Sequence, residues 1–364
     1  RPVRSKRATN GSCTIHPTTA NTIRNVFPIL MKRIAFHIAL ILFSQNLIAQ
    51  LLPNLGGQRA GISTLTFLKN DVSPRSMAMS GANLTLSADG MSTFHNPATM
   101  AQAKGMHFTA NDLLLGAGIH QSWFSALIPM KSSTSALGFN LNYLSSGAMK
   151  VRTEFQPLGT GAYFYANQLA GGLAYSKLLS DRFSFGANLK VIHERLAQYT
   201  NTTIGADLGF LYTTDIRGLK FGIVVQNFGG NSALSGDFLE VDFNRSNVNL
   251  DKYAMPTVFR LGASINALDQ EDQKIVVAVQ LEHPNDNSEN LRIASEYNFK
   301  ELLFVRGGIK INVQGQRLPT LGLGYRARLG RNAIMVNYAI NSTQYLGTLH
   351  AFGLDLMINN DKRE

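Results

Sequence analysis

The most informative feature of this chain is an alternation of apolar residues with polar or small ones, which begins near residue 104. In TTIGADLGFLYTT (202–214), every second position from Ile204 to Phe210 is apolar, and the positions between them hold Asp207 and glycines. Successive side chains of a β-strand point to opposite faces, so this period of two predicts strands rather than helices. The same alternation recurs in SFGANLKVI, TLGLGYRARL and HAFGLDLMI. The pattern therefore predicts an all-β fold.

Fourteen strands are predicted from the alternating runs and the turn residues that separate them. Their ranges are about 104–110, 120–129, 135–144, 165–178, 183–193, 202–213, 218–227, 256–267, 273–282, 290–299, 302–312, 319–329, 333–341 and 348–358. An even number of strands places both ends of the strand region on one side of a membrane. That side is the periplasm for an exported chain.

The connections between these strands alternate in length. The short ones read MKSST, LLSDR, TTDIRG, ALDQED, FKE and LGRN, and the longer or more polar ones cover 145–164, 194–201, 227–255, 283–289, 313–318 and 341–347. Outer-membrane barrels have short periplasmic turns and longer outward loops. The alternation favours a transmembrane antiparallel β-barrel over the main alternative, a large soluble β-sandwich with one wet face.

The low charge of the chain agrees with a membrane barrel. Charged residues make up 16% of the sequence and hydrophobic residues 45%, whereas soluble domains hold about 25% charged residues. In a barrel the apolar face of each strand meets lipid, and the lumen tolerates Lys190, Asp207, Arg326 and Arg328. Only a closed sheet leaves no unpaired backbone groups in hydrocarbon.

Residues 50–103 precede the predicted barrel, which covers 104–358, and they lack sustained alternation. The stretch SPRSMAMSGANLTLSADGMSTFHNPATMAQ is rich in Ser, Gly, Ala and Met, which suggests short helical and turn pieces. A barrel of this size is wider than the roughly eight-stranded size that side chains alone can fill. We therefore expect this N-terminal segment to enter the lumen as a hatch. Residues 359–364 form a charged tail.

The first 49 residues have a different character. MKRIAFHIALILFSQNLIAQ, which starts at Met31, has a basic start, an apolar run and the small residue Ala49. This arrangement predicts a secretory signal peptide at 31–49, and its apolar core is too short for the alternative, a membrane anchor. Residues 1–30 precede the signal and are expected to lie outside the mature protein.

Removing these residues changes the charge balance. The chain holds 34 basic and 23 acidic residues, and its first 50 residues hold seven of the basic and none of the acidic ones. The remainder holds 27 and 23, so the formal charge of +11 falls to +4 and no nucleic-acid partner is expected. Cys13 is the single cysteine, so the mature protein is expected to lack disulfides and thiolate sites.

The N-terminal segment resembles the PorV/PorQ family in the order of its short motifs. FLKNDVSPRSMAMSGANLTLSADGMSTFHNPATM carries an FL pair, an Arg, a Gly, an Asp and an aromatic residue just before Asn-Pro-Ala. The matching residues are Phe67, Leu68, Arg75, Gly81, Asp89, Phe94, Asn96, Pro97 and Ala98. ANLKVIHERLAQYTNTTIGADLGFLY, FGIVVQNFGG and AFGLDLMI resemble the family as well, so the resemblance covers roughly residues 51–358.

The resemblance implies a FadL-like outer-membrane barrel that works in type IX protein secretion. Its implied partners are outer-membrane lipid, proteins of the translocon or attachment complex, and the C-terminal signal domains of cargo. A role of this kind involves no chemistry. The alternative function is a FadL-like channel for small hydrophobic solutes, against which the charged inward residues argue mildly. A third possibility is an enzyme barrel.

Two groups of residues are candidate sites. The hatch motif, Asp89, Phe94, Asn96, Pro97 and Ala98, mainly suggests structural roles, because Asp-Gly and Asn-Pro pairs favour turns.

The long connection at 227–255 is the candidate partner loop. It mixes the aromatic residues Phe238, Phe243 and Tyr253 with acidic and basic ones, and long outward loops commonly carry contacts with partners.

Motifs for chemistry are absent from the sequence. GLGYRA (322–327) matches a dinucleotide fingerprint, but the strand alternation runs through it, and the fingerprint needs a helix at its glycines. His193-Glu194 has no second histidine at metalloprotease spacing, and the other histidines are scattered. No Ser and His pair for a lipid-facing phospholipase is recognisable. We expect no catalytic residue, cofactor or metal.

Overall fold

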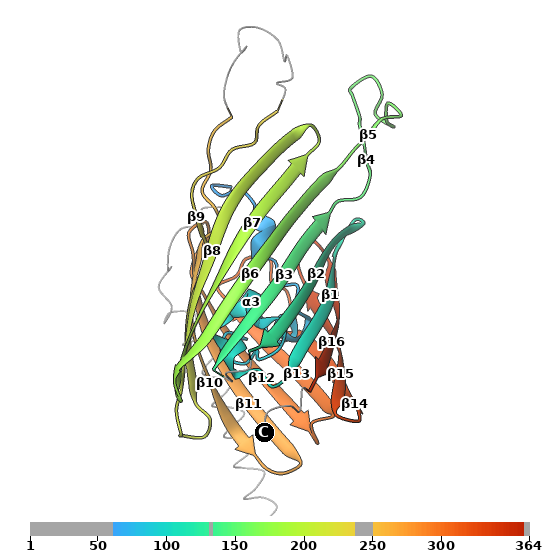
Figure 1. Cartoon of the computed structure of the whole chain (residues 1–364). Coiled ribbons are helices and arrows are strands. Elements are labelled where there is room, and N and C mark those ends of the chain that lie inside the picture. The colour runs from blue at the N-terminus through green and yellow to red at the C-terminus, as the bar shows by residue number, and fades with distance from the viewer. Residues whose placement is uncertain (1–60, 131–133, 237–249, 360–364) are drawn as a thin grey trace, which may run out of the picture. The chain divides into compact units, whose positions relative to one another are not determined.

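The computed structural model describes residues 61–130, 134–236 and 250–359. Figure 1 shows these residues as a β-barrel with short helical segments among its strands. The predicted signal peptide at 31–49, residues 1–30 and most of the charged tail lie outside the described residues, as do Phe238 and Phe243. Within the described part of the chain, no helix has the length and hydropathy needed to cross a membrane.

Fourteen antiparallel strands form the wall, and the wall is closed because the first strand pairs with both the second and the last. The strands are β1 (Met106–Gly116), β2 (Ile119–Pro129), β3 (Ser135–Ser145), β6 (Ala166–Ser180), β7 (Phe183–Leu196), β8 (Tyr199–Thr213), β9 (Lys220–Gly229), β10 (Val258–Asp269), β11 (Gln273–Pro284), β12 (Asn290–Phe299), β13 (Leu303–Ile311), β14 (Thr320–Leu329), β15 (Asn332–Ser342) and β16 (Thr348–Ile358). The predicted fold class, a fourteen-stranded antiparallel barrel, is confirmed.

The alternation of the sequence separates the two faces of this wall. Along β8, Ile204 and Phe210 are exposed on the outside, whereas Asp207 is buried inside. Lys190 of β7 also points inward and is buried, and Arg326 of β14 is largely covered. Lipid solvates the outer apolar face, and the lumen takes the polar face. Arg328 lies nearer the end of β14 and is exposed.

The two ends of the barrel differ. We call the end with the β2–β3, β6–β7, β8–β9, β10–β11, β12–β13 and β14–β15 connections the turn end, and the opposite end the loop end. The predicted 194–201 connection is wrong, because β7 and β8 extend until only Ala197 and Gln198 join them. Polar residues in this stretch suggested a loop, but polar side chains are equally suited to strand ends beyond the hydrocarbon layer.

One further prediction at the loop end is corrected, and the structure adds detail to another. The first strand continues to Gly116 instead of ending near residue 110, and three consecutive leucines had hidden its alternation. Within the predicted 145–164 loop, β4 (Met149–Lys150) and β5 (Tyr163–Phe164) form a small hairpin. This hairpin extends beyond the wall in Figure 1.

Residues 61–105, which we call the hatch, contain four short helical segments: η1 (Thr66–Lys69), α2 (Pro74–Ala78), α3 (Ser92–His95) and η2 (Pro97–Gln102). The segment α2 packs against β13 to β16, and η2 packs against β2, β3 and β6 to β8. These strands lie on different sides of the barrel, so the hatch occupies the lumen between them. Most hatch side chains are buried.

Glycines on the inner face of the wall are the places where the hatch comes closest. A Cβ atom at Gly186 would lie 2.2 Å from the backbone carbon of Pro97, and one at Gly308 would lie 2.7 Å from that of Met79. At Gly322 the Cβ would lie 2.5 Å from the Ala78 Cβ. Only a residue without a side chain permits such an approach. The hatch is therefore seated against specific points of the wall.

Candidate functional site

The lumen near the loop end has an apolar side, formed by the hatch together with strands β1, β2, β3, β6, β7, β15 and β16. Two clusters of buried residues make up this side. One contains Val72, Met77, Ala78, Met91, Phe94, Leu113, Trp123, Ala339, Leu349 and Ala351, and the other contains Leu65, Phe67, Leu68, Ala170, Ile192 and Met255. Leu115 and Leu144 are only partly buried at the edges of these clusters. They extend the apolar surface toward the loop end.

Trp123, the one tryptophan of the chain, lies within this apolar side. Its ring meets Phe94 of the hatch edge to face, with 5.2 Å between ring centroids. Its Nε1–H has no hydrogen-bond partner among the described residues. Beside it lies a cavity of about 10 Å³, also lined by Leu68 and Phe94. Such a volume holds about one water molecule, so the hatch and wall are almost in contact here.

The opposite side of the lumen is charged. Arg75 of the hatch donates two hydrogen bonds to Glu296 of β12, at 2.9 and 2.8 Å. Arg306 of β13 donates to the same carboxylate at 2.5 Å. All three side chains are mostly or fully buried. Buried charges persist only when they are paired in this way, so Glu296 binds the hatch to the wall.

A second carboxylate of the wall has the same arrangement. Glu282 of β11 accepts from Arg260 at 2.8 Å and from Arg292 at 2.6 Å. Closer to the loop end, Lys69 of the hatch pairs with Asp286 at 2.6 Å. Sequence reasoning did not single out these residues, although charged residues at alternate strand positions were an available signal.

The predicted lumen residues Lys190 and Asp207 form an ion pair of 2.7 Å. Lys190 also donates to Asn227 at 2.5 Å. The two charges of this pair therefore compensate each other.

The predicted hatch motif is brought together as a folded unit. Asn96 caps η2, because its Oδ1 accepts from Ala98 N at 3.0 Å. Its Nδ2 donates to the carbonyl oxygens of Leu84 and Phe210, each at 3.2 Å. Pro97 occupies the first turn of η2, as expected where no backbone N–H is needed.

The remaining motif residues also hold the hatch in shape. Asp89 Oδ1 accepts from Met91 N at 3.0 Å, and its carboxylate lies 3.6 Å from Arg75. Burial raises the pKa of Asp89, and the nearby Asp355 carboxylate raises it further, while Arg75 opposes both effects. Phe94 packs against Trp123. These contacts give the motif a structural role within the described residues.

The candidate partner loop is only partly described. Tyr253 is exposed and forms a backbone bridge with Ser232. No group of three His, Cys, Asp or Glu residues suited to a metal occurs in the described ranges.

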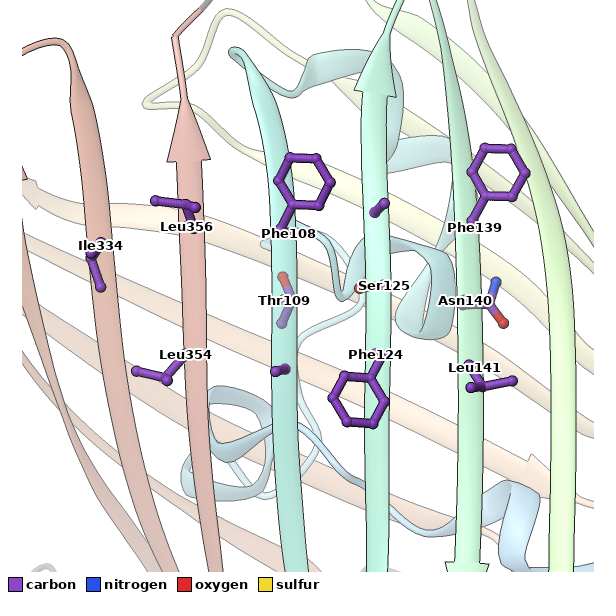
Figure 2. Close-up of a pocket in the computed structure, with 12 residues that line it drawn as sticks. Phe108, Thr109, Phe124, Ser125, Phe139, Asn140, Leu141, Ile334, Leu354 and Leu356 are labelled. Atoms are coloured by element: carbon purple, nitrogen blue, oxygen red, sulfur yellow. The ribbon is translucent and has the colours of Figure 1, made fainter.

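The outer face of the wall carries an apolar groove of about 580 Å³, shown in Figure 2. Phe108, Phe124 and Phe139 lie along it, and the small residues Ala110 and Ala126 leave the space between them. Leu141, Ile334, Leu354 and Leu356 complete its apolar lining. Thr109, Ser125 and Asn140, on the same strands, point toward the lumen. The groove therefore opens to the lipid side of β15, β16, β1, β2 and β3.

Polar side chains lie on the same outer face, toward the loop end. Ser122 Oγ donates to Asp112 Oδ1 at 2.7 Å, and His120 Nδ1 lies 3.4 Å from Asp112 Oδ2. The sequence pattern does not place these residues on one face, because the predicted first strand ends near residue 110, whereas β1 continues to Gly116. A nucleophilic serine needs the imidazole as its own hydrogen-bond partner. Here the carboxylate stands between the two, so this is not a catalytic relay.

Comparison with known proteins identifies the fold. Neither a family model nor a curated protein matches the sequence. The CymD monoaromatic hydrocarbon channel has a TM-score of 0.54 and 13% identity, over 83% of this chain and 100% of that one.

Two further solved structures are similar. The Pseudomonas putida toluene transporter TodX gives a TM-score of 0.51 and 12% identity, over 82% of this chain and 98% of that one. The Ralstonia pickettii toluene transporter TbuX gives 0.50 and 14%, over 78% and 96%. At these identities the likeness establishes the barrel architecture.

Proposed function

We propose that this protein is an outer-membrane channel that admits small hydrophobic molecules. The observation that carries the proposal is the apolar side of the lumen, which continues from Leu115 and Leu144 to Trp123 and the hatch. Three barrels of similar architecture are named for toluene or monoaromatic hydrocarbons. A small apolar solute would find favourable surface at the partly buried Leu115 and Leu144, at about 25 cal/mol for each Å² it buries.

The charges inside the barrel are compatible with this function. Lys190 and Asp207 neutralise each other, and Arg326 lies toward the turn end. Glu282 and Glu296 lie on the charged side with their arginines. An apolar solute can therefore follow the apolar side of the lumen past the hatch. Ions and sugars have no such surface to follow, and the seated hatch blocks them.

The sole tryptophan provides a direct test. The protein is reconstituted in bilayers, and the fluorescence of Trp123 is followed while bromobenzene, an apolar heavy-atom quencher, is added. We expect quenching that saturates, because bromobenzene binds a limited apolar surface on the way to the ring and reaches the ring when the hatch yields. Bromide ion should quench little. A linear response equal to that of a lipid-facing tryptophan would contradict the proposal.

Two variants separate occupancy of the lumen from partition into lipid. Leu144→Asp places a charge at the entrance and should abolish saturable quenching of Trp123, whereas Leu144→Met should preserve it. The double variant Trp123→Phe/Phe124→Trp moves the fluorophore to the lipid face. Its quenching should be insensitive to Leu144→Asp.

A second candidate function is partner binding in type IX secretion, as the PorV/PorQ resemblance implies. The hairpin between β4 and β5 favours it, since Phe155 is 94% exposed and Leu158 is 88% exposed. Apolar side chains at such a tip are typical of contacts with another protein.

Cells expressing Phe155→Ser/Leu158→Ser should then accumulate secreted surface proteins in the periplasm, while Thr160→Ser, in the same hairpin, should not. Normal secretion in the double variant would remove this candidate, and the fluorescence result would be unaffected.

A further inference from the structure

The lipid-facing groove and the polar residues beside it form successive levels on the outer wall. Strand register places Ile334, Leu356, Phe108, Ala126 and Phe139 at one level. The next level toward the loop end holds Val336, Leu354, Ala110, Phe124 and Leu141. These two levels supply the groove, with Ala110 and Ala126 as its low points.

The character of the wall changes at the third level. It holds Tyr338, Phe352, Asp112, Ser122 and Tyr143, and the fourth holds Ile340, His350, Leu114, His120 and Ser145. Tyrosines gather where a barrel crosses the membrane interface. Tyr338 and Tyr143 of the third level therefore mark the approach to the membrane interface, on the loop-end side of the groove.

The connection between the two central strands of this surface is short. Only Ala117 and Gly118 connect β1 to β2, and in Figure 1 this hairpin ends lower than the β7–β8 hairpin. The side chains of Asp112 and His120 are 39% and 55% exposed to solvent. A molecule in the groove can therefore reach Asp112 with its polar end.

The charge of this surface selects the kind of headgroup. The five strands β15, β16, β1, β2 and β3 contain no lysine or arginine. Asp112 is an acidic group on their outer face at the interface, held in place by Ser122 at 2.7 Å. An anionic headgroup would find no lysine or arginine on these strands and only the imidazoles of His120 and His350, whereas an ammonium group would find a carboxylate acceptor.

We propose that this surface binds an amine-bearing membrane lipid, with an acyl chain in the groove and its ammonium group on Asp112. The groove takes the chain because its apolar walls rise on both sides of Ala110 and Ala126. Asp112 takes the headgroup, since an ammonium donates charge-assisted hydrogen bonds to a carboxylate. The proposal does not depend on the function of the lumen.

Native mass spectrometry of the detergent-purified full chain tests the proposal. The protein is titrated with phosphatidylethanolamine, phosphatidylcholine or phosphatidylglycerol of identical chains. We expect phosphatidylethanolamine to bind most tightly. Phosphatidylglycerol should bind about tenfold more weakly, which is the loss of one charge-assisted hydrogen bond. Equal binding of the two lipids would overturn the assignment of the headgroup.

Variants separate the contributions of charge and groove. Asp112→Asn should bring the affinity for phosphatidylethanolamine down to that for phosphatidylglycerol. Ala126→Trp should weaken all three lipids, because it fills the groove. The control Ala263→Trp changes a lipid-facing alanine of β10, away from the groove, and should leave binding unchanged.

Three results would contradict the proposal. The first is unchanged lipid selectivity in Asp112→Asn, and the second is an equal loss of lipid affinity in Ala126→Trp and Ala263→Trp. The third is a dimer of the wild-type chain that Ala126→Trp dissociates. The last result would mean that a second copy covers the groove. Thermal unfolding of each variant in detergent shows whether it is folded, so a lost lipid is not confused with a lost barrel.

Discussion

Two adjacent glycines of β13 test whether the hatch is held by the wall. Gly308 faces the lumen, where a Cβ atom would lie 2.7 Å from the Met79 backbone carbon, and Gly307 faces lipid, where the nearest atom would be 3.5 Å away. We therefore compare Gly308→Ala with Gly307→Ala. The two variants add the same methyl group to the same strand, but only one meets the hatch.

The size of the effect follows from the distances. Contacts of real Cβ atoms become ordinary at 3.4 Å, so the hatch backbone must withdraw by about 0.7 Å. Overpacking of this kind costs about 1–3 kcal/mol, and removing a strand glycine returns about 0.5–1 kcal/mol. Ser80, next to Met79, resists movement because its hydroxyl lies 2.8 Å from that of Thr320.

The assay is the swelling rate of proteoliposomes in an isotonic sugar, which reports a displaced hatch. The middle of these ranges leaves a net loss of about 1 kcal/mol, which raises the displaced population about fivefold, so Gly308→Ala should leak sugar faster. Gly307→Ala should leak no more than the wild type. Equal leakage in the two variants would refute the claim that inward glycines seat the hatch.

Further predictions concern the ion pairs, the buried histidine and the cap of the hatch. Glu296→Gln removes the counter-charge of Arg306 and leaves Arg75 with Asp89 alone, which should lower unfolding stability by about 3–5 kcal/mol; the exposed Glu301→Gln should cost less than about 1 kcal/mol in the same melting experiment. Burial lowers the pKa of His95 from 6.5 to about 4. Between these two pH values the unfolded state binds a proton that the folded state does not, so stability should fall by about 3 kcal/mol as the pH drops from 6.5 to 4. A His95→Gln variant that keeps the same pH dependence would contradict this. Asn96→Ala removes the cap of η2 and should make the hatch about 0.5–2 kcal/mol easier to release, measured as protease cleavage of the hatch; cleavage at the wild-type rate would count against it.

The wall was largely predictable because lipid and lumen impose opposite demands on alternate residues. The last three predicted strands match the observed ones within one residue at each end. The prediction failed where lipid no longer imposes this pattern. The three leucines at 113–115 face lumen and lipid in turn. Because both faces are apolar there, the sequence shows no alternation that would reveal the strand.

The contents of the lumen were less predictable from the sequence. Arg75 was noted only as part of a family resemblance, whereas the structure pairs it with Glu296, more than two hundred residues away. The apolar side depends in the same way on hatch residues such as Phe94 meeting Trp123 across the lumen. Such contacts depend on the path of the hatch, which has no periodic pattern. The groove was equally hidden, since it needs five strands in a known register.

The central claim is that a hatch-sealed barrel offers passage to small apolar molecules alone. It is tested most directly in cells with a lipopolysaccharide outer leaflet that lack other channels of this type. The uptake rates of labelled toluene and of a sugar are measured with and without the protein. We expect the protein to raise toluene uptake at low concentration and to leave sugar uptake unchanged, and toluene uptake should fall to background with Leu144→Asp. Unchanged toluene uptake, or an equal rise for the sugar, would contradict the account.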